Sequence, residues 1–569
     1  MRLSVFPALL AVLCSVQAHA ESVRTPTPAE QVDALFKRYD SPQAPGCSVA
    51  VIDNGKLLLK KSFGMADPAL GVPMTSGTSI WIPYSEARIL VALAVSMLAR
   101  DGKLSLDDPI RQHIPQLPAY AAAVTVRQLV HHSSGLADYG VLIPAFDSMW
   151  TRMSEDEFFR VLSRWNKLGF APGQQTMYSN TDYALLEMLV ERISGGSLHD
   201  FLHAQLLQPM GMTDTRIGAD QAVVHPGHAL FHEPDGEGWR RVFPYRTSPV
   251  GGISVTTSLD DLIRLDAALR DPSSGLALLL EQLEAGAPAP TTDAPDKGFA
   301  FGLFRRDFRG LPLIEYRGIG GYRYLVQVRG SGLSVATLCN AYPGMEAFGP
   351  EVARLYAGPA SSGEPEARRT TAAPAPAVGP VVDVAPAELE RYGGEYRNAS
   401  GQTFTLAVDG KRLSVTPRGS KPYPPLLPLG EGRFRTDIGE STYVLTFTPD
   451  GDDMVMSAWD VTANESGGEE LRRTSEPAWP KTADFKAYPG TYIGDDVEAV
   501  LHVRTEQGRV HVAAQGMAET VLEPLKQADH FKGPDIYATR FERNAQGKVV
   551  ALVLDATRVK GIRFTRRQP

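Results

Sequence analysis

Cysteine is scarce in this sequence, which has three cysteines among 569 residues. So few cysteines exclude the dense disulfide framework that holds small secreted domains together. Cys14 lies in an apolar N-terminal segment, and Cys47 and Cys339 each lie in an apolar run typical of a strand. The latter two could form one bridge in an oxidising compartment, but we predict two buried free thiols, because free cysteine behaves as a small apolar side chain.

An excess of positive charge is also absent. The 57 lysine and arginine residues are outnumbered by 65 aspartate and glutamate residues, which gives a formal net charge of −8. No basic run is long enough to follow a phosphate backbone, so nucleic acid is not an expected partner. Hydrophobic residues make up 43% of the chain and charged residues 21%, as is typical of a globular protein.

Beyond the N-terminus, no apolar run approaches the roughly 18 residues that a membrane span requires. The N-terminus itself has the three parts of an export signal: Arg2, the apolar residues 5–13, and the cleavage signature Ala-His-Ala at 18–20. We therefore predict that residues 1–20 are a signal peptide cleaved after Ala20. The mature protein is then expected to be periplasmic or secreted, with no membrane span.

Residues 21–357 carry strand patterns at both ends and helical patterns between them. The turn-forming pair Asn54-Gly55 interrupts an apolar run and predicts a hairpin over 47–61. This order predicts an α+β domain in which an antiparallel sheet carries a separate helical region. Helices are expected at 85–100, 182–193 and 259–269, and further strands near 313 and at 324–328 and 333–338.

The composition changes over residues 358–386, which are rich in proline and alanine and are expected to form a linker. Two similar segments follow, because the pattern of residues 389–396 recurs at 485–492. We predict two small all-β, barrel-like domains at 387–476 and 482–569. Neither segment holds a catalytic set of serine, histidine and acidic residues, so a structural or substrate-gating role is expected.

The segment that carries chemistry begins at Ser85. After Pro83 the sequence favours a helix that is apolar on nearly every side, which is typical of a buried helix. Ser85 lies in the first turn, where backbone N–H groups and the helix dipole stabilise an alkoxide or oxyanion. Arg88 follows three residues later on the same face of the helix.

This segment resembles the S-x-x-K nucleophile motif of serine β-lactamases, penicillin-binding DD-peptidases and related esterases and D-aminopeptidases. Residues 178–180, Tyr-Ser-Asn, are similar to the Y-x-N element of that family, and the stretches 128–136, 251–262 and 333–340 are similar to further family segments in the same order. The resemblance implies a β-lactamase/transpeptidase-like fold. It also implies a nucleophile at Ser85, a catalytic role for Tyr178 and a substrate-binding role for Asn180. The linker and two β domains are similar to the plan of D-aminopeptidases in the family.

The chain departs from the family pattern at the lysine of S-x-x-K, where it has Arg88. A buried lysine can lose its proton and act as a general base, whereas arginine stays protonated. The charge of Arg88 could instead favour the phenolate of Tyr178, which would then take the proton of Ser85. In the structural alternative, Ser85 only begins a helix, Tyr178 only packs, and Arg88 pairs with an acidic residue, Glu86 or Glu315.

A second departure lies in the third family element, K-T-G or H-x-G. The register set by the following glycines places Glu315, Tyr316 and Arg317 there, so the positive or imidazole group becomes a carboxylate. A shift of one or two residues would bring Arg317 to the key position. In this register Gly318 supplies a second oxyanion N–H, and Glu315 and Arg317 border the substrate.

No metal or cofactor is expected. His199 and His203 have the spacing of metal ligands on a helix, but no third ligand is evident and two surface histidines are the better interpretation. His132 is expected to satisfy a local backbone group.

Together these features predict an exported serine hydrolase acting by acyl transfer through Ser85 on a peptide, amide or ester. A D-amino-acid-containing compound is among the expected small-molecule or peptide ligands. The alternative is a catalytically impaired relative that binds a cell-wall-like or peptide-like ligand. The sequence does not indicate an oligomeric state.

Overall fold

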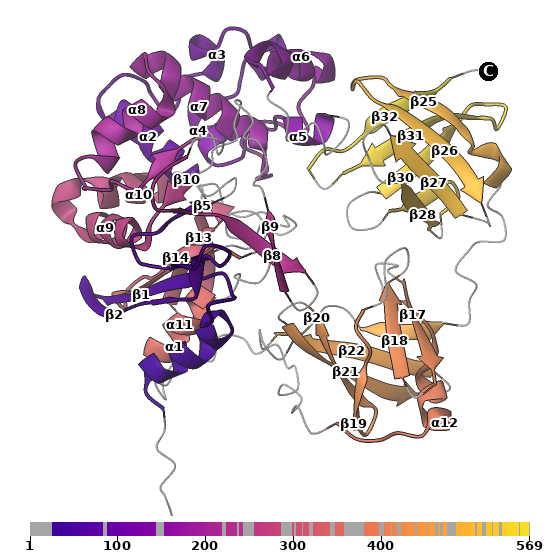
Figure 1. The fold of residues 1–569 in the computed structure, drawn as a ribbon. Helices are drawn as coiled ribbons and strands as arrows, with labels where there is room; N and C mark the ends of the chain where they lie inside the picture. The colour runs from indigo at the N-terminus through magenta and orange to yellow at the C-terminus, as the bar shows by residue number, and fades with distance from the viewer. Residues whose placement is uncertain are drawn as a thin grey trace, which may run out of the picture.

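The computed structural model describes residues 26–82, 88–143, 153–218, 224–235, 238–242, 255–285, 299–300, 303–309, 311–317, 323–341, 348–357, 381–397, 403–410, 412–417, 423–438, 441–451, 453–460, 465–466, 470–474, 485–506, 509–514, 519–525, 527–533, 538–556 and 558–567. In these ranges an α+β domain precedes two β domains, as the sequence predicts (Figure 1). None of the helices in them is both long and apolar enough to cross a membrane. The predicted signal peptide, 1–20, and residues 358–380 of the predicted linker lie outside the described residues.

The first domain is built on an antiparallel sheet of seven strands in the order β11-β12-β13-β14-β15-β1-β2. Strands from the two ends of the domain therefore lie side by side in its centre. The predicted hairpin is confirmed: Asn54 and Gly55 join β1 and β2 with φ values of 47° and 78°, which suit a type I′ turn. The strands are β1 (Cys47–Asp53), β2 (Lys56–Phe63), β11 (Phe299–Ala300), β12 (Leu303–Phe308), β13 (Leu311–Arg317), β14 (Arg323–Val328) and β15 (Leu333–Cys339).

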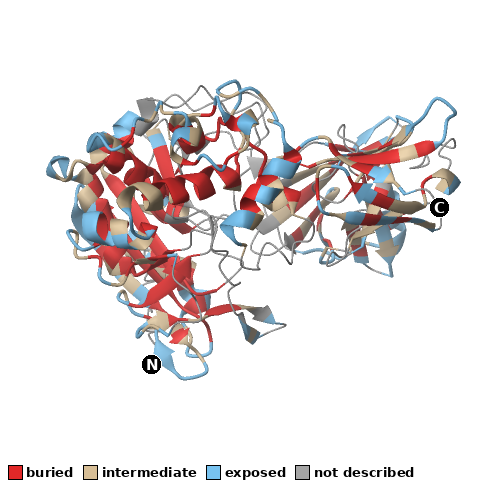
Figure 2. Ribbon diagram, turned by 90° about the horizontal axis from the view of Figure 1, so that it is seen from above, coloured by how far each residue is buried: buried red, intermediate tan, exposed pale blue. Residues whose placement is uncertain are grey.

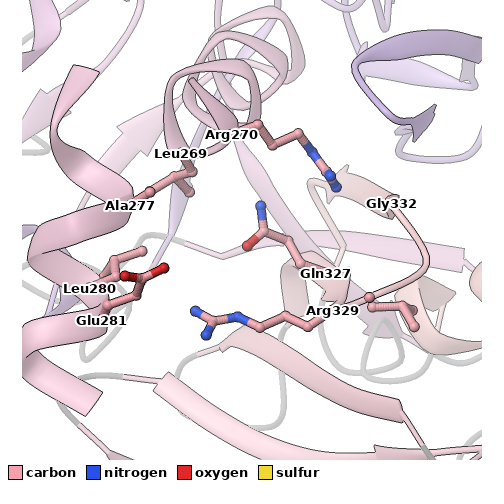
Figure 3. A pocket seen from close by; sticks show the side chains of 10 residues that line it. Leu269, Arg270, Ala277, Leu280, Glu281, Gln327, Arg329 and Gly332 are labelled. Atoms are coloured by element: carbon pink, nitrogen blue, oxygen red, sulfur yellow. The ribbon is translucent and has the colours of Figure 1, made fainter. Parts of the chain in front are cut away.

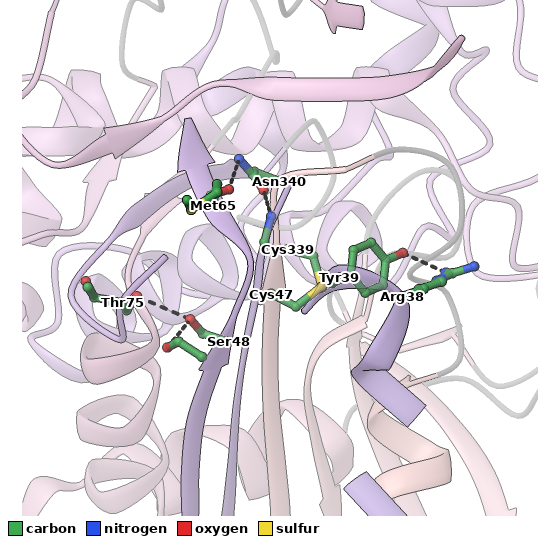
Figure 4. The surroundings of a disulfide bond; sticks show 10 residues. Arg38, Tyr39, Cys47, Ser48, Met65, Thr75, Cys339 and Asn340 are labelled. Carbon is green, nitrogen blue, oxygen red and sulfur yellow. Dashed lines mark hydrogen bonds between the residues drawn. A yellow bond between two sulfur atoms is a disulfide. The ribbon is translucent and has the colours of Figure 1, made fainter. Parts of the chain in front are cut away.

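Cys47 and Cys339 form a disulfide bond between β1 and β15 (Figure 4). The antiparallel pairing puts the two residues directly opposite each other, with their Cα atoms 4.0 Å apart. The prediction of two free thiols is therefore wrong. Each cysteine lies in a buried strand as expected, but a strand pattern does not reveal which strand, 292 residues away in the chain, is its neighbour.

We expect the double change Cys47→Ala and Cys339→Ala to lower the free energy of unfolding by about 3 kcal/mol, because the bridge closes a long loop and restricts the unfolded chain. Urea unfolding followed by circular dichroism measures this difference. Reduced wild-type protein should unfold like the double variant, and the reductant should leave the double variant unchanged. A wild-type midpoint that is insensitive to reductant would contradict the prediction.

Helices cover both faces of this sheet. α1 (Pro28–Phe36) packs on α11 (Phe348–Tyr356), which contacts β14 and β15 on one face. α9 (Leu259–Arg270) contacts β1 and β15 on the other face, where its buried Asp266 accepts a hydrogen bond from Ser334. α10 (Leu276–Ala285) joins α9 to the helical region.

The helical region surrounds α2 (Arg88–Arg100), whose residues 88–98 are all buried, as predicted for this segment. Figure 2 shows buried residues, in red, gathered inside the first domain. α7 (Asn180–Ser194) and α8 (Leu198–Leu202) pack against it. The other helices are α3 (Ile110–His113), α4 (Val126–Val130), α5 (Tyr139–Leu142) and α6 (Glu155–Trp165). Short strands complete the domain: β3 (Met65–Asp67), β4 (Val72–Pro73), β5 (Ser79–Ile82), β6 (Arg216–Ile217), β7 (His228–Ala229), β8 (Phe231–Asp235), β9 (Gly238–Val242) and β10 (Val255–Thr257).

The two β domains confirm the predicted barrel-like repeats. Strands β25–β32 form a closed barrel, and the first β domain is a nine-stranded sheet that the bridge between Leu413 and Leu426 nearly closes. In both domains the second tyrosine of the repeated pattern donates a hydrogen bond to the carbonyl of the first, from Tyr396 to Tyr392 at 3.0 Å and from Tyr492 to Tyr488 at 2.7 Å. The repeated pattern thus encodes the same local structure twice.

The elements of the first β domain are α12 (Pro386–Leu389), β16 (Gly394–Arg397), β17 (Thr403–Asp409), β18 (Arg412–Pro417), β19 (Leu427–Gly430), β20 (Arg433–Ile438), β21 (Ser441–Asp450), β22 (Asp453–Asp460), β23 (Glu465–Ser466) and β24 (Leu471–Thr474). Those of the barrel are β25 (Gly490–Gly494), β26 (Val500–Glu506), β27 (Arg509–Ala514), β28 (Thr520–Pro524), β29 (His530–Lys532), β30 (Ala538–Arg543), β31 (Val549–Asp555) and β32 (Ile562–Arg566).

Candidate active site

The predicted Y-x-N element lies at the start of α7, where Ser179 is the N-terminal capping residue and Asn180 begins the helix. Tyr178 immediately precedes it and is 8% exposed. α7 packs directly on the buried helix α2. Because Tyr178 leads into α7, this packing also fixes the position of the tyrosine. The first turns of α2 and α7 therefore present their side chains to each other.

Arg88, the first residue of α2, makes this contact. Its Nη2 donates a hydrogen bond of 2.7 Å to Oδ1 of Asn180. Its guanidinium carbon lies 4.4 Å from the ring centroid of Tyr178 and 4.9 Å from that of Tyr183. The structure thus brings together three of the predicted site residues, Arg88, Tyr178 and Asn180. Cation–π contacts with two rings and an amide acceptor hold the arginine in a buried position.

Asp138 is a site residue that the sequence analysis missed. It caps the N-terminus of α5 through Gly140, and both of its carboxylate oxygens accept hydrogen bonds from Nδ2 of Asn180, at 3.0 and 2.9 Å. The carboxylate therefore fixes the amide orientation in which Asn180 offers its oxygen to Arg88. An aspartate directly before a short helical pattern is a capping signal, and this signal could have drawn attention to it.

Arg558, from the loop between β31 and β32, also reaches this group. Its Nη1 lies 2.9 Å from Oδ2 of Asp138, and its guanidinium carbon lies 4.6 Å from the ring centroid of Tyr178. The second β domain therefore contributes a charged side chain to the same site. A partner 420 residues away in the chain leaves no signal in the local sequence.

His132 lies behind Tyr178, with 4.8 Å between the ring centroids. Its Nδ1 is 2.8 Å from Oδ2 of Asp182 on α7, and both side chains are fully buried. Ser134 donates a hydrogen bond of 2.6 Å to the other carboxylate oxygen. The expectation that His132 satisfies a local backbone group is therefore wrong. The N–H of Ser179, which approaches Nδ1 at 3.3 Å, is 47 residues away in the chain, and the nearer partner is the carboxyl group of Asp182.

Burial controls the ionisation of this pair. It lowers the pKa of the His132 imidazole well below its ordinary value, and the nearby charges of Arg88 and Arg558 lower it further. Burial also raises the pKa of the Asp182 carboxyl well above its ordinary value, although the hydrogen bond from Ser134 opposes this shift. Both shifts disfavour charge on the pair. The pair lies behind the ring of Tyr178 and supports it by packing.

Two other predicted site residues, Glu315 and Arg317, belong to β13. Glu315 is fully buried, and it lies opposite Val326 of β14, whose side chain contacts Gly349 of α11. Its neighbour Tyr316 points to the opposite face, where its hydroxyl donates to Gln327. Glu315 therefore lies on the α11 side of the sheet, away from α9, and its substrate-binding role stays a prediction.

Arg317 is the last residue of β13, and its side chain is not described. Ser85 and Gly318 lie outside the described residues, as does Glu86, the alternative partner of Arg88. The nucleophile and the second oxyanion donor therefore stay predictions.

His199 and His203 lie side by side on α8 and the turn that follows, with ring centroids 5.7 Å apart. Nδ1 of His199 accepts a hydrogen bond of 3.3 Å from the N–H of Ile217. In the described part of the chain, no group of three or more histidine, cysteine or acidic side chains could hold a metal ion.

A sequence profile of the β-lactamase family matches residues 32–358, which is more than half of the chain. The chain belongs to the β-lactamase family. The matched region includes every residue of the site described above except Arg558. That one residue comes from a domain beyond the family match.

Two curated relatives illustrate the range of the family. Penicillin-binding protein 4* of Bacillus subtilis is 27% identical over 255 residues, which cover 42% of this chain and 55% of the relative. This chain thus spans about half the length of that relative. Esterase EstB of Burkholderia gladioli is 29% identical over 382 residues, which cover 58% of this chain and 95% of the esterase.

Among solved structures, the octameric penicillin-binding protein homologue of Pyrococcus abyssi matches with a TM-score of 0.50 and 22% identity. The match covers 78% of this chain and 99% of that chain. It shows a shared fold that extends beyond the family match into the C-terminal β region.

Proposed function

We propose that this member of the β-lactamase family is an exported serine hydrolase that forms an acyl-enzyme on Ser85 with a peptide, amide or ester. The observation that carries the proposal is the contact between Arg88, Tyr178 and Asn180. These residues belong to two sequence motifs about 90 positions apart, and their meeting at the start of α2 and α7 supports a site for acyl transfer there.

In the proposed reaction the hydroxyl oxygen of Ser85 attacks the carbonyl carbon, and its proton passes to the phenolate oxygen of Tyr178. The tetrahedral intermediate collapses to an acyl-enzyme as the leaving group takes up the proton, and water then releases the acid. Arg88 cannot exchange a proton in this cycle, because a guanidinium group stays protonated. It stabilises negative charge that develops beside Tyr178 and holds Asn180 toward the substrate.

Export is supported by the disulfide between Cys47 and Cys339, because such bonds persist in oxidising compartments. The bond agrees with the predicted signal peptide and with a periplasmic or secreted location. Among substrates, the esterase relative supports an ester and the penicillin-binding relative supports a penicillin-like amide, and a peptide or D-amino-acid-containing compound is our narrower proposal.

A second function is favoured by one observation, namely that a fixed cation replaces the lysine of the nucleophile motif. In this alternative the protein keeps the pocket and binds a cell-wall-like or peptide-like ligand without turnover. Such a ligand would raise the unfolding temperature without releasing product.

Covalent labelling separates the two functions. We expect a fluorophosphonate or a fluorescent penicillin to label the purified mature protein and Ser85→Ala to abolish the label, because the acylated oxygen is removed. The change Ser414→Ala, in strand β18 of the first β domain, is the matched control and should label fully. Equal labelling of wild type and Ser85→Ala would refute the hydrolase, provided that both proteins show the same circular dichroism spectrum.

A further inference from the structure

A cavity of about 280 Å³ lies between α9, α10 and the turn that follows β14 (Figure 3). The third family element, which we expect to border the active site, lies at the end of β13, where Arg317 pairs with Arg323. Val328, at the other end of β14, pairs with Leu313 near the start of β13. The cavity beside Val328 therefore lies at the far end of these two strands from that element and is a separate feature of the first domain.

Part of the cavity wall is apolar. Leu269 of α9, Leu280 of α10 and Val328 of β14 line it, and all three are buried side chains of the domain core. The cavity is slightly smaller than the roughly 300–1,000 Å³ of pockets that hold drug-sized ligands. A wall and a volume of this kind suit a small ligand with one aliphatic side chain.

A guanidinium group in a fixed position borders the apolar wall. Nε of Arg270 donates a hydrogen bond of 2.9 Å to Oδ2 of Asp266, and Nη2 donates one to the hydroxyl of Ser334. Asp266 is fully buried, and Ser334 and Gln327 donate hydrogen bonds to its other carboxylate oxygen. No described residue accepts a hydrogen bond from Nη1 of Arg270, so this group can donate to a ligand in the cavity.

The opposite charge comes from α10. Glu281 lines the cavity there, and its carboxylate has no hydrogen-bond or ion-pair partner among the described residues. Figure 3 shows it on a different wall of the cavity from Arg270, and Arg329 adds a cation at the turn after β14. A plain anion would meet the carboxylate of Glu281, and a plain cation would meet Arg270. A zwitterion avoids both conflicts.

We propose that this cavity binds a small zwitterion with an aliphatic side chain, as found in a free amino acid or a dipeptide. The carboxylate of the ligand accepts a hydrogen bond from Nη1 of Arg270, its ammonium group faces Glu281, and its side chain packs on Leu269 and Leu280. α10 also packs on α2, the helix that begins at Arg88. A ligand that joins α9 to α10 therefore contacts an element that supports α2.

NMR titration with the mature protein tests binding of three zwitterions: L-leucine, D-leucine and L-alanyl-L-leucine. We expect saturable binding of at least one of them, and the compound that binds most tightly identifies the ligand as an amino acid or a dipeptide. Leucinamide lacks the carboxylate, and 4-methylpentanoate lacks the ammonium group. Each should bind at least about 10-fold more weakly than leucine, because each leaves one charged group of the cavity without a partner.

Variants of the cavity wall show where the zwitterion binds. Glu281→Gln should weaken binding about 5-fold, the value of an exposed ion pair. Arg270→Lys should weaken it about 10-fold, because lysine keeps a cation beside Asp266 but lacks the additional donors of a guanidinium. Gln282→Ala, at an exposed position of α10 that does not line the cavity, is the matched control and should bind like wild type.

Ser85→Ala should also bind the zwitterion with wild-type affinity. Loss of binding in this variant would place the ligand in the candidate active site and overturn the inference. Wild-type affinity in Glu281→Gln would overturn it too, as would equal binding of leucine and 4-methylpentanoate or the absence of saturable binding by all three zwitterions. None of these results decides whether the protein is a hydrolase, because covalent labelling of Ser85 tests that function separately.

Discussion

The change Tyr178→Phe should lower the rate of Ser85 acylation by about 10³-fold while the protein stays folded. A positioned general base contributes a factor of this size, and phenylalanine removes the phenolate oxygen that would receive the proton. No other described residue at the site suits this role equally well. Arg88 stays protonated, and His132 and Asp182 form a closed pair behind the tyrosine ring. The phenyl ring of this variant would keep its packing with both guanidinium groups. The expected loss of acylation rate therefore comes from the missing oxygen and not from altered packing.

Stopped-flow measurement of the p-nitrophenol that is released when p-nitrophenyl butyrate acylates Ser85 gives this rate directly. Tyr183→Phe is the matched control, because Tyr183 also stacks on Arg88 but its hydroxyl donates to the carbonyl of Val130, at 3.0 Å. We expect that variant to have a free energy of unfolding about 1 kcal/mol lower than wild type and an acylation rate close to that of wild type. Similar rates for the two variants would assign the base to another group.

The domain plan follows from the sequence because it depends on local patterns. Asn54-Gly55 forces a tight turn wherever it occurs between strands, and the repeated tyrosines close the same hydrogen bond within four residues in each β domain. Likewise, the apolar residues after Arg88 require burial on every side, and α2 is buried accordingly.

The missed features all depend on pairing between distant segments. Cys339 meets Cys47 only through the order of the strands, and Asp138 meets Arg558 only through the docking of one domain on another. The sequence predicts Asp182 in the first turn of a helix, where aspartate is usually exposed to solvent. Its burial against His132 depends on how α7 packs, and helical periodicity does not specify that packing.

The buried pair of Asp182 and His132 should therefore be among the most sensitive sites of the first domain. We expect Asp182→Leu to lower the free energy of unfolding by about 4 kcal/mol, because it leaves the buried hydroxyl of Ser134 and Nδ1 of His132 without their shared partner. The imidazole also packs against Tyr178, so its displacement should reduce acylation of Ser85 as well. Urea unfolding and fluorophosphonate labelling measure the two effects separately.

Asp182→Asn is the informative control, because an amide has the shape of the carboxyl group and offers one oxygen and one N–H group to the same two partners. If the pair is neutral in the folded protein, as the two pKa shifts indicate, the amide reproduces its hydrogen bonds and the loss should stay below about 1 kcal/mol. A loss as large as that of the leucine variant would show that a buried negative charge at position 182 is itself required. In that case Asp182 would act electrostatically on His132 and Arg88, and labelling of the asparagine variant should fall together with its stability.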